Sequence, residues 1–187
     1  SRSLEDDHSE ETESWVTAQN KVPREYLADS PERAKIEKRR TEIWNVDRFG
    51  TPFQVGNRYF YSRNDGLQNQ SVLYTLDTLD GEARVLLDPN NLSEDGTVAL
   101  SDYEVSDDGT LLAYAISRSG SDWKEWKVRD VATGTDKTDH LKWSKFSGAA
   151  WSPDSQGFYY SRYDAPPEGS EYKAENFNQK VYYHRLG

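Results

Sequence analysis

The larger part of this chain repeats itself at a spacing of 53 residues. Tyr61 and Tyr114, which each end a short apolar segment, lie 53 residues apart. Gly81 and Gly134, which each end a polar segment, have the same separation, and Gly187 follows Gly134 after another 53 residues. A fixed period of this length indicates an array of similar structural units that stack on their neighbours.

The third copy of the repeat starts closer to the second. The segments 106–109 and 152–157 resemble each other, and each precedes an apolar run. Tyr160 follows Tyr114 by only 46 residues, whereas the full spacing returns at Gly187. The third unit therefore carries seven extra residues, which we place in the segment 164–180.

Short runs rich in Tyr, Phe, Val and Leu alternate with clusters of Gly, Asp, Asn and Ser in residues 45–187. These runs predict strands at 58–61, 71–74, 85–87, 111–114, 126–128, 157–160 and 180–183. No convincing helical pattern interrupts them, so this part is predicted to be all-β. Units of about four short strands that end in a polar turn are typical of the blades of a β-propeller.

Two complete units and part of a third do not make a closed propeller. A blade cannot bury both faces of its sheet alone, and propellers close with about four to eight blades. We therefore expect the chain to be a portion of a larger protein, with blades one, two and part of three in residues 45–187.

Residues 1–44 are predicted to be helical. We expect one helix to start after Ser9, where the acidic first turn suits the positive end of the helix, and to break at Pro23. A second helix is expected to begin with Ser30 as N-cap and Pro31 at its first position. Apolar residues at spacings of three and four predict the buried faces, which comprise Trp15, Val16, Val22, Ile36, Ile43 and Trp44.

Composition excludes several classes of function. The chain has no cysteine, which rules out disulfides, thiolate zinc sites and cysteine nucleophiles. A mean hydropathy of −0.98 without a long apolar run excludes a membrane-spanning segment. The formal charge of −10, without a basic block, argues against binding to nucleic acid or to an anionic membrane surface.

Catalytic motifs are absent from the sequence. There is no Gly-x-Ser-x-Gly elbow, no HExxH, no P-loop and no GxGxxG. We interpret the three histidines His8, His140 and His184 as structural or surface residues. Four aspartates in turn sequences could be calcium ligands, but turn formation explains them more simply; they are Asp102, Asp107, Asp108 and Asp154. We expect no cofactor, no metal and no catalytic residue in this chain.

A series of motifs stands in a characteristic order from one end of the chain to the other. They lie at 4–7, 15–16, 18–20, 58–61, 66–70, 87–90, 95–100, 119–123, 145–147 and 182–184. Together they resemble the prolyl oligopeptidase family of serine peptidases, and Asp95–Leu100 separates the chain from the sister oligopeptidase B group. The first residues, Ser1–Asp6, depart from the usual Asp-Pro-Tyr-Arg-Trp-Leu-Glu-Asp and indicate a cut or altered start.

The resemblance implies a two-domain serine endopeptidase that cleaves short peptides on the carboxyl side of proline. Residues 1–44 would belong to its α/β-hydrolase domain, and 45–187 to an inserted seven-bladed propeller that filters substrates. The Ser-Asp-His triad would lie beyond Gly187, so this chain alone is predicted to be inactive. Its partners would be short proline-containing peptides and the remainder of its own polypeptide.

Two residues are expected to contact substrate or its binding groups. By resemblance, Phe146 would line the pocket for the residue two before the scissile proline, and a Phe in a blade core is the alternative. Asp122 would lie near a substrate-binding arginine of the hydrolase domain, and a turn aspartate is the alternative. Trp123 is expected to serve packing. The segment 164–180 resembles a mobile interdomain loop that gates entry, although its composition also suits simple disorder.

A function of another class stays open at this point. The chain could be a non-catalytic propeller module that binds a partner protein, and the sequence downstream of Gly187 would discriminate the two. The expected location is the cytoplasm, with a periplasm as the alternative, because the absence of cysteine fits both.

Overall fold

The computed structural model describes residues 2–6, 9–171 and 176–187. The chain divides into two compact units, Ser1–Val46 and Asp47–Gly187. The first is helical and the second consists of strands, which confirms a mainly β fold preceded by a helical segment. The assignment of residues 1–44 to a peptidase domain stays a prediction.

The first unit contains a short 3-10 helix, Arg2–Glu5, and two α-helices, α1 (Glu10–Ala28) and α2 (Arg33–Trp44). Ser9 caps α1 as expected, because its Oγ accepts the Thr12 backbone N–H at 3.2 Å. Among the described residues, no helix has both the length and the apolar character that crossing a membrane requires.

Two predicted helix boundaries were wrong. Helix α1 continues through Pro23. Proline has no backbone N–H, so one helical hydrogen bond is lost, but the carbonyl that it leaves without a partner lies on a solvent-exposed helix. The Lys21–Glu25 ion pair at 3.6 Å spans the proline. Helix α2 begins at Arg33 with Glu32 as N-cap. Ser30 does not cap it, because its carbonyl accepts the Arg33 N–H in a turn that precedes the helix.

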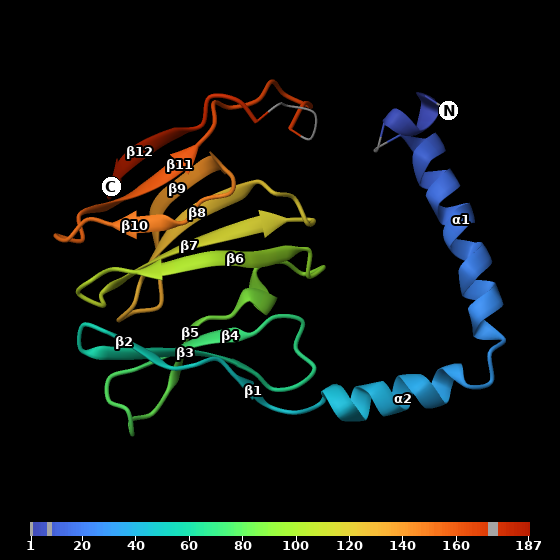
Figure 1. Cartoon of the computed structure of the whole chain (residues 1–187), viewed down its shortest axis with the longest axis horizontal. Helices are drawn as coiled ribbons and strands as arrows, with labels where there is room; N and C mark the ends of the chain where they lie inside the picture. The colour runs from blue at the N-terminus through green and yellow to red at the C-terminus, as the bar shows by residue number, and fades with distance from the viewer. Residues whose placement is uncertain (1, 7–8, 172–175) are drawn as a thin grey trace. The chain divides into compact units, whose positions relative to one another are not determined.

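The predicted buried faces of the helices are exposed in this structure. Ile36 and Trp44 are 56% and 57% exposed, and no residue of α2, all of which the structure describes, is buried. In α1, Thr12 is the residue that is buried, rather than Trp15 or Val16. The two helices extend in different directions from the turn that joins them (Figure 1), so neither supplies a core for the other. An apolar helix face is buried only where another element packs on it.

The second unit is built from three antiparallel sheets. The first contains β1 (Arg48–Phe49), β2 (Phe53–Val55), β3 (Arg58–Asn64), β4 (Val72–Leu76) and β5 (Arg84–Leu87). The second contains β6 (Val98–Val105), β7 (Leu111–Arg118), β8 (Lys124–Asp130) and β9 (Asp136–Ser144). The third contains β10 (Ala149–Trp151), β11 (Gly157–Arg162) and β12 (Lys180–Arg185). A 3-10 turn, Pro89–Asn91, precedes β6.

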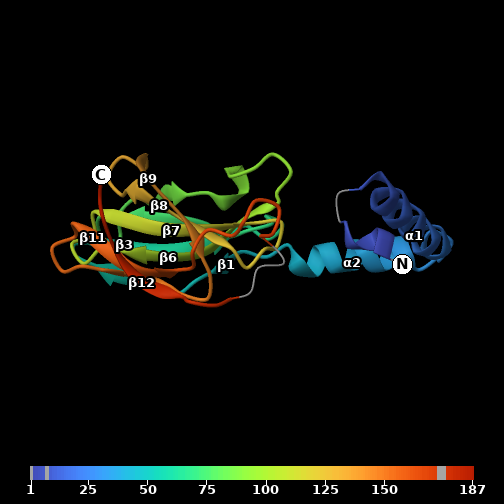
Figure 2. The same cartoon turned by 90° about the horizontal axis from the view of Figure 1, so that it is seen from above.

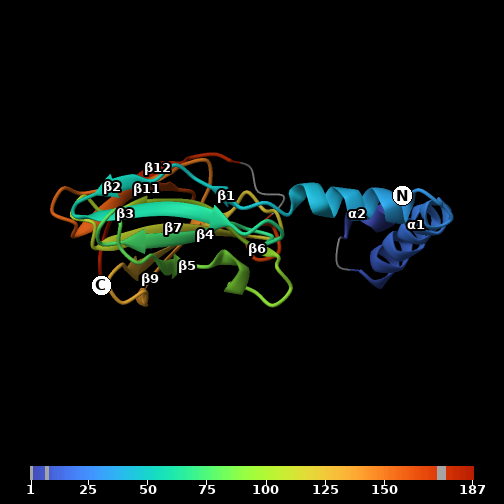
Figure 3. The same cartoon turned by 90° about the horizontal axis from the view of Figure 1, so that it is seen from below.

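The 53-residue repeat corresponds to one sheet. Tyr61, Tyr114 and Tyr160 lie on β3, β7 and β11, which are equivalent strands of the three sheets. Gly81 and Gly134 lie in the connections β4–β5 and β8–β9. The sheets follow one another in chain order (Figure 1), and views from above and below show their strands stacked (Figures 2 and 3).

Equivalent turns join the first two strands of the second and third sheets. The Ser106 Oγ donates to Asp108 Oδ1 at 2.7 Å, and the Ser152 Oγ donates to Asp154 Oδ1 at 2.6 Å. The same oxygens accept the backbone N–H two residues further on. Ser155, with φ of +54°, occupies the left-handed position that a glycine takes in the other turn. The interpretation of Asp108 and Asp154 as turn residues is thereby confirmed.

The apolar core lies between the sheets, in two layers. On β7, Leu112, Tyr114 and Ile116 pack toward the first sheet, where Phe60 and Leu73 meet them. The alternate residues of β7 pack toward the third sheet with Trp126 and Phe158, and they are Leu111, Ala113 and Ala115. Successive side chains of a strand point to opposite faces. The strand is therefore apolar at every position from 111 to 116, because both of its faces are covered.

Polar side chains also connect the sheets. The amide of Gln70 donates to the Val98 carbonyl at 2.9 Å and accepts the Leu100 N–H at 2.9 Å. Arg129 donates to the Leu86 carbonyl, at 2.9 Å. Trp151 Nε1 donates to the Glu104 carbonyl at 3.0 Å and so joins the third sheet to the second.

A buried carboxylate holds the last strand against the second sheet. Asp139 Oδ1 lies 2.7 Å from His184 Nε2 and accepts the Gly187 N–H at 2.9 Å. Burial alone would raise the pKa of Asp139, but these two hydrogen bonds hold it below its ordinary value.

Replacement of a core residue of β7 tests the two-sided packing. We expect Leu112→Ala to lower the free energy of unfolding by about 2–5 kcal/mol, because Leu112 is fully buried between two sheets. Ser117→Ala on the same strand is the control and should cost less than about 0.5 kcal/mol. Denaturant unfolding measures both values, and equal costs would contradict the proposed core.

The Asp139 contact predicts a dependence of stability on pH. Because its pKa is lower in the folded state, the contact stabilises the fold above about pH 4 and this contribution is lost as the pH falls through the folded pKa. Asp139→Asn should therefore reduce the acid loss of stability in chemical denaturation at a series of pH values. Asp107→Asn, an exposed change on the turn after β6, serves as the comparison. An unchanged acid slope in Asp139→Asn would refute this assignment.

Candidate functional site

Phe146 lies in the turn between β9 and β10, and its side chain is 64% exposed. The alternative that Phe146 is part of a blade core was wrong, because its ring is exposed to solvent, and its predicted contact with substrate stays a prediction. Its backbone has φ of +54°, and Trp143, the next-to-last residue of β9, has φ of +69°. Left-handed conformations at residues other than glycine are strained and cluster at functional sites.

Asp122 lies in the turn between β7 and β8 and is exposed. Its carboxylate has no partner among the residues that the structure describes. Asp122 lines a pocket of about 240 Å³, whose walls also include Ser119, Trp123, Lys145 and Glu171. Since Lys145 directly precedes Phe146, the structure brings the two predicted site residues to the same end of the second sheet.

Trp123 forms the centre of an aromatic cluster beside this pocket. Its ring meets Trp143 edge to face at 5.4 Å between centroids, and Tyr163 in the same way at 6.0 Å. The indole N–H donates to the Glu171 carbonyl at 2.7 Å. The prediction that Trp123 serves packing is confirmed.

Lys145 is a residue of the site that sequence reasoning missed. Its Nζ lies 3.7 Å from the centroid of the Trp123 ring and donates to Asn176 Oδ1 at 3.1 Å. A lysine between two aromatic residues gives no signal in a single sequence, because lysines are normally exposed. Only the fold shows that this one is buried.

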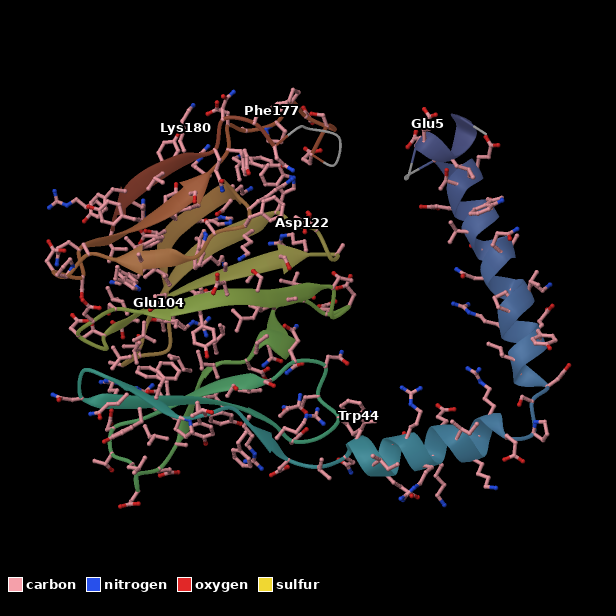
Figure 4. All side chains as sticks on the ribbon, viewed as in Figure 1. Glu5, Trp44, Glu104, Asp122, Phe177 and Lys180 are labelled. Carbon is pink, nitrogen blue, oxygen red and sulfur yellow. The ribbon has the colours of Figure 1, made fainter. Side chains whose placement is uncertain are left out.

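The segment 164–180 connects β11 to β12, and residues 172–175 lie outside the described part of it. Lys180 pairs with Asp164 at 3.2 Å, which closes the base of the segment. Figure 4 shows Asp122 and Phe177 toward one end of the sheets, with Lys180 at the start of β12. A gating role of this segment stays a prediction.

The two described histidines take part in contacts within a sheet (His140) and between two sheets (His184). His140 Nε2 lies 2.7 Å from Glu125 Oε2, and His184 contacts Asp139 as above. Neither hydrogen-bonds a serine hydroxyl, and both match the structural interpretation. His8 lies outside the described residues. The site on this chain therefore offers an exposed ring, a carboxylate and a polar pocket, which suit binding rather than covalent chemistry.

Comparison with known proteins decides the family. Residues 2–187 match the family described as prolyl oligopeptidase, N-terminal beta-propeller domain. The chain belongs to the prolyl oligopeptidase family. The three sheets are accordingly blades of a propeller, as the repeat predicted.

Two relatives illustrate the similarity in sequence. The chain is 44% identical over 186 residues to a prolyl endopeptidase of Elizabethkingia meningoseptica. It is 32% identical over 203 residues to a dual function macrocyclase-peptidase of Galerina marginata. The alignments cover 100% and 97% of this chain, but 26% and 28% of those proteins, so the chain spans about a quarter of their length.

Solved structures agree. A structure from a study of two prolyl endopeptidases and the role of inter-domain dynamics superposes with a TM-score of 0.88 at 34% identity, and covers 100% of this chain and 28% of that one. A structure of prolyl oligopeptidase B of Galerina marginata, bound to a 35mer substrate, superposes with a TM-score of 0.84 at 30% identity. That match covers 98% of this chain and 28% of the other.

The geometry predicts that the site residues differ in their importance for stability. Asp122→Asn and Phe146→Ala should change the free energy of unfolding by less than about 0.5 kcal/mol, because both side chains are exposed. Trp123→Ala should cost about 2 kcal/mol or more, since it removes the centre of the aromatic cluster. Denaturant unfolding of the three variants measures this. A loss in Asp122→Asn as large as that in Trp123→Ala would show a structural role for Asp122.

Proposed function

We propose that this chain is the N-terminal portion of a serine endopeptidase that cleaves short peptides on the carboxyl side of proline. The match of residues 2–187 to the N-terminal propeller of the prolyl oligopeptidase family carries the proposal. The two relatives named above are a prolyl endopeptidase and a macrocyclase-peptidase, which supports peptide chemistry at proline. The cytoplasm stays the predicted location.

The catalytic groups are proposed to lie in another part of the polypeptide. Three structures of the Galerina marginata enzyme with bound substrate carry alanine in place of an aspartate, a serine or a histidine, which supports a triad of these residues. In such a triad the serine oxygen attacks the carbonyl carbon of the proline while the histidine takes the proton of the serine hydroxyl. The histidine then returns the proton to the leaving amine, and water releases the acyl group.

The blades of this chain are proposed to act as a filter and as a binding surface. Exposed apolar side chains lie on the outer faces of the first and third sheets, including Phe49, Val85, Tyr159 and Val181, which supports continuation of the propeller on both sides. A closed ring of blades would admit only short peptides.

Phe146 and Asp122 have separate proposed roles. The exposed ring of Phe146 supplies apolar area to the substrate residue two before the proline, at a low entropic cost because the side chain has two torsions. The carboxylate of Asp122, which has no partner among the described residues, is suited to pair with an arginine of the hydrolase domain.

Hydrolysis of reporter peptides tests the proposal. The full-length polypeptide should hydrolyse a Gly-Pro reporter, and Phe146→Ala should raise KM about three- to tenfold for peptides extended by apolar residues before the proline, with little effect on the shortest reporter. Steady-state kinetics across a substrate-length series measures both.

The 187-residue chain alone is the control and should show no hydrolysis. If the full-length polypeptide also fails to hydrolyse the reporter, the peptidase proposal is wrong and a non-catalytic interaction module gains support. If kcat/KM of Phe146→Ala is unchanged for every peptide, the role of Phe146 alone is wrong.

A further inference from the structure

The turn between β9 and β10 is held in a strained shape around a buried lysine. The left-handed residues Trp143, on β9, and Phe146, in the turn, flank Ser144 and Lys145 in the sequence, and Ser144 and Lys145 are both buried. Ser144 Oγ donates to the Ser161 carbonyl and accepts the Trp126 indole N–H. Strained backbone persists only where the surroundings over-determine it, so the position of Phe146 is set by what holds this turn.

Lys145 is the unusual member of the turn. The residue is only 7% exposed to solvent, and no carboxylate among the described residues pairs with its ammonium group. An ammonium group that leaves water needs compensation. Here the Trp123 ring at 3.7 Å and the side-chain amide oxygen Oδ1 of Asn176 at 3.1 Å provide it.

The contacts of Lys145 join two segments that are far apart in the sequence. Asn176 lies in the β11–β12 connection, and Gln179 of the same connection donates to the Lys145 backbone carbonyl at 3.0 Å. The ring of Trp123, which the ammonium group contacts, donates its indole N–H to the backbone carbonyl of Glu171 in that connection. Lys145 thus links the Phe146 turn, the aromatic cluster and the described ends of the β11–β12 connection.

Each partner of the Lys145–Asn176 hydrogen bond precedes an exposed phenylalanine. Phe146 follows Lys145 and is 64% exposed, and Phe177 follows Asn176 and is 67% exposed. The charged Lys145 is buried while the two aromatic rings are exposed, which is the reverse of the usual distribution of these side chains. Rings held in water by a buried polar anchor are suited to meet an apolar ligand.

We propose that Lys145 is a positioning residue which holds Phe146 and Phe177 as a paired apolar contact for the substrate residues before the proline. Phe177 is then a second residue that determines specificity. This inference rests on the proposed peptidase function and deepens it, because it names the apolar peptide segment as the chemistry that the pair recognises. Lysine acts here through its charge on the Trp123 ring and its hydrogen bond to Asn176. Arginine can supply both and methionine neither, so arginine should substitute for lysine better than methionine does.

Kinetics of the full-length polypeptide test the inference. Lys145→Met and Phe177→Ala should each raise KM about three- to tenfold for a reporter with apolar residues before the Gly-Pro unit, a larger change than for the Gly-Pro reporter itself. Lys145→Arg should restore most of the affinity. Lys142→Met, an exposed lysine on β9, is the matched control and should have no effect.

Fluorine NMR separates this inference from the peptidase proposal. With fluorophenylalanine at position 146 or 177 of the full-length polypeptide, Lys145→Met should shift and narrow both resonances toward those of a free side chain, and Lys142→Met should leave them in place. This readout does not require activity, so it stands if hydrolysis is absent.

Three results would overturn the inference. Unchanged resonances in Lys145→Met would show that the lysine does not position the rings. Equal losses on both reporters would show a general structural effect. An unchanged KM of Phe177→Ala on the extended reporter, in an enzyme that hydrolyses it, would remove Phe177 from the specificity surface.

Discussion

Strand β7, in the second sheet, is buried on both faces, by the first sheet on one side and by the third sheet on the other. The rest of the propeller unit is arranged around this packing. Residues 111–116 send alternate side chains into the two core layers, so that the first and third sheets are each bound to the second. The polar contacts of Gln70, Arg129 and Trp151 then fix the relative position of the sheets. The turn that carries Phe146 starts at the end of β9, beside this central sheet, and its place follows from the same packing.

The repeat made the sheets predictable, because each unit carries an apolar strand that leads to a tyrosine. The strands that the sequence pattern did not reveal include short ones, such as β2 and β10, and the polar strand β9. Strand β9, Asp136–Ser144, has charged residues at four of its nine positions, since much of it faces solvent. Its β-structure comes from pairing with β8, which no local pattern reports. The helix boundaries at Pro23 and Ser30 were missed for a similar reason, because local propensity is weak where solvent or a turn satisfies the backbone.

The candidate site was predictable only in part. Phe146 and Asp122 were named from motif resemblance. The structure places Asp122 in a pocket that Lys145, the residue before Phe146, also lines, without testing what either residue binds. Lys145 and Phe177 were not predicted. Their roles depend on contacts over about thirty residues of sequence, such as Lys145 to Asn176. Hydrophobicity alone predicts an exposed lysine and buried phenylalanines, but here Lys145 is buried and Phe146 and Phe177 are exposed.

The left-handed backbone at Phe146 has a consequence for how this protein would respond to selection for thermal stability. Glycine adopts that conformation without strain, so a screen that rewards stability alone should favour glycine at this position. Such a screen would remove an exposed ring and improve the fold at the same time. Proteins commonly keep this kind of conflict at sites where activity needs a strained geometry. If selection for activity at ordinary temperature retains the phenylalanine, and selection for thermal stability replaces it, then the requirements of stability and of function differ at this turn.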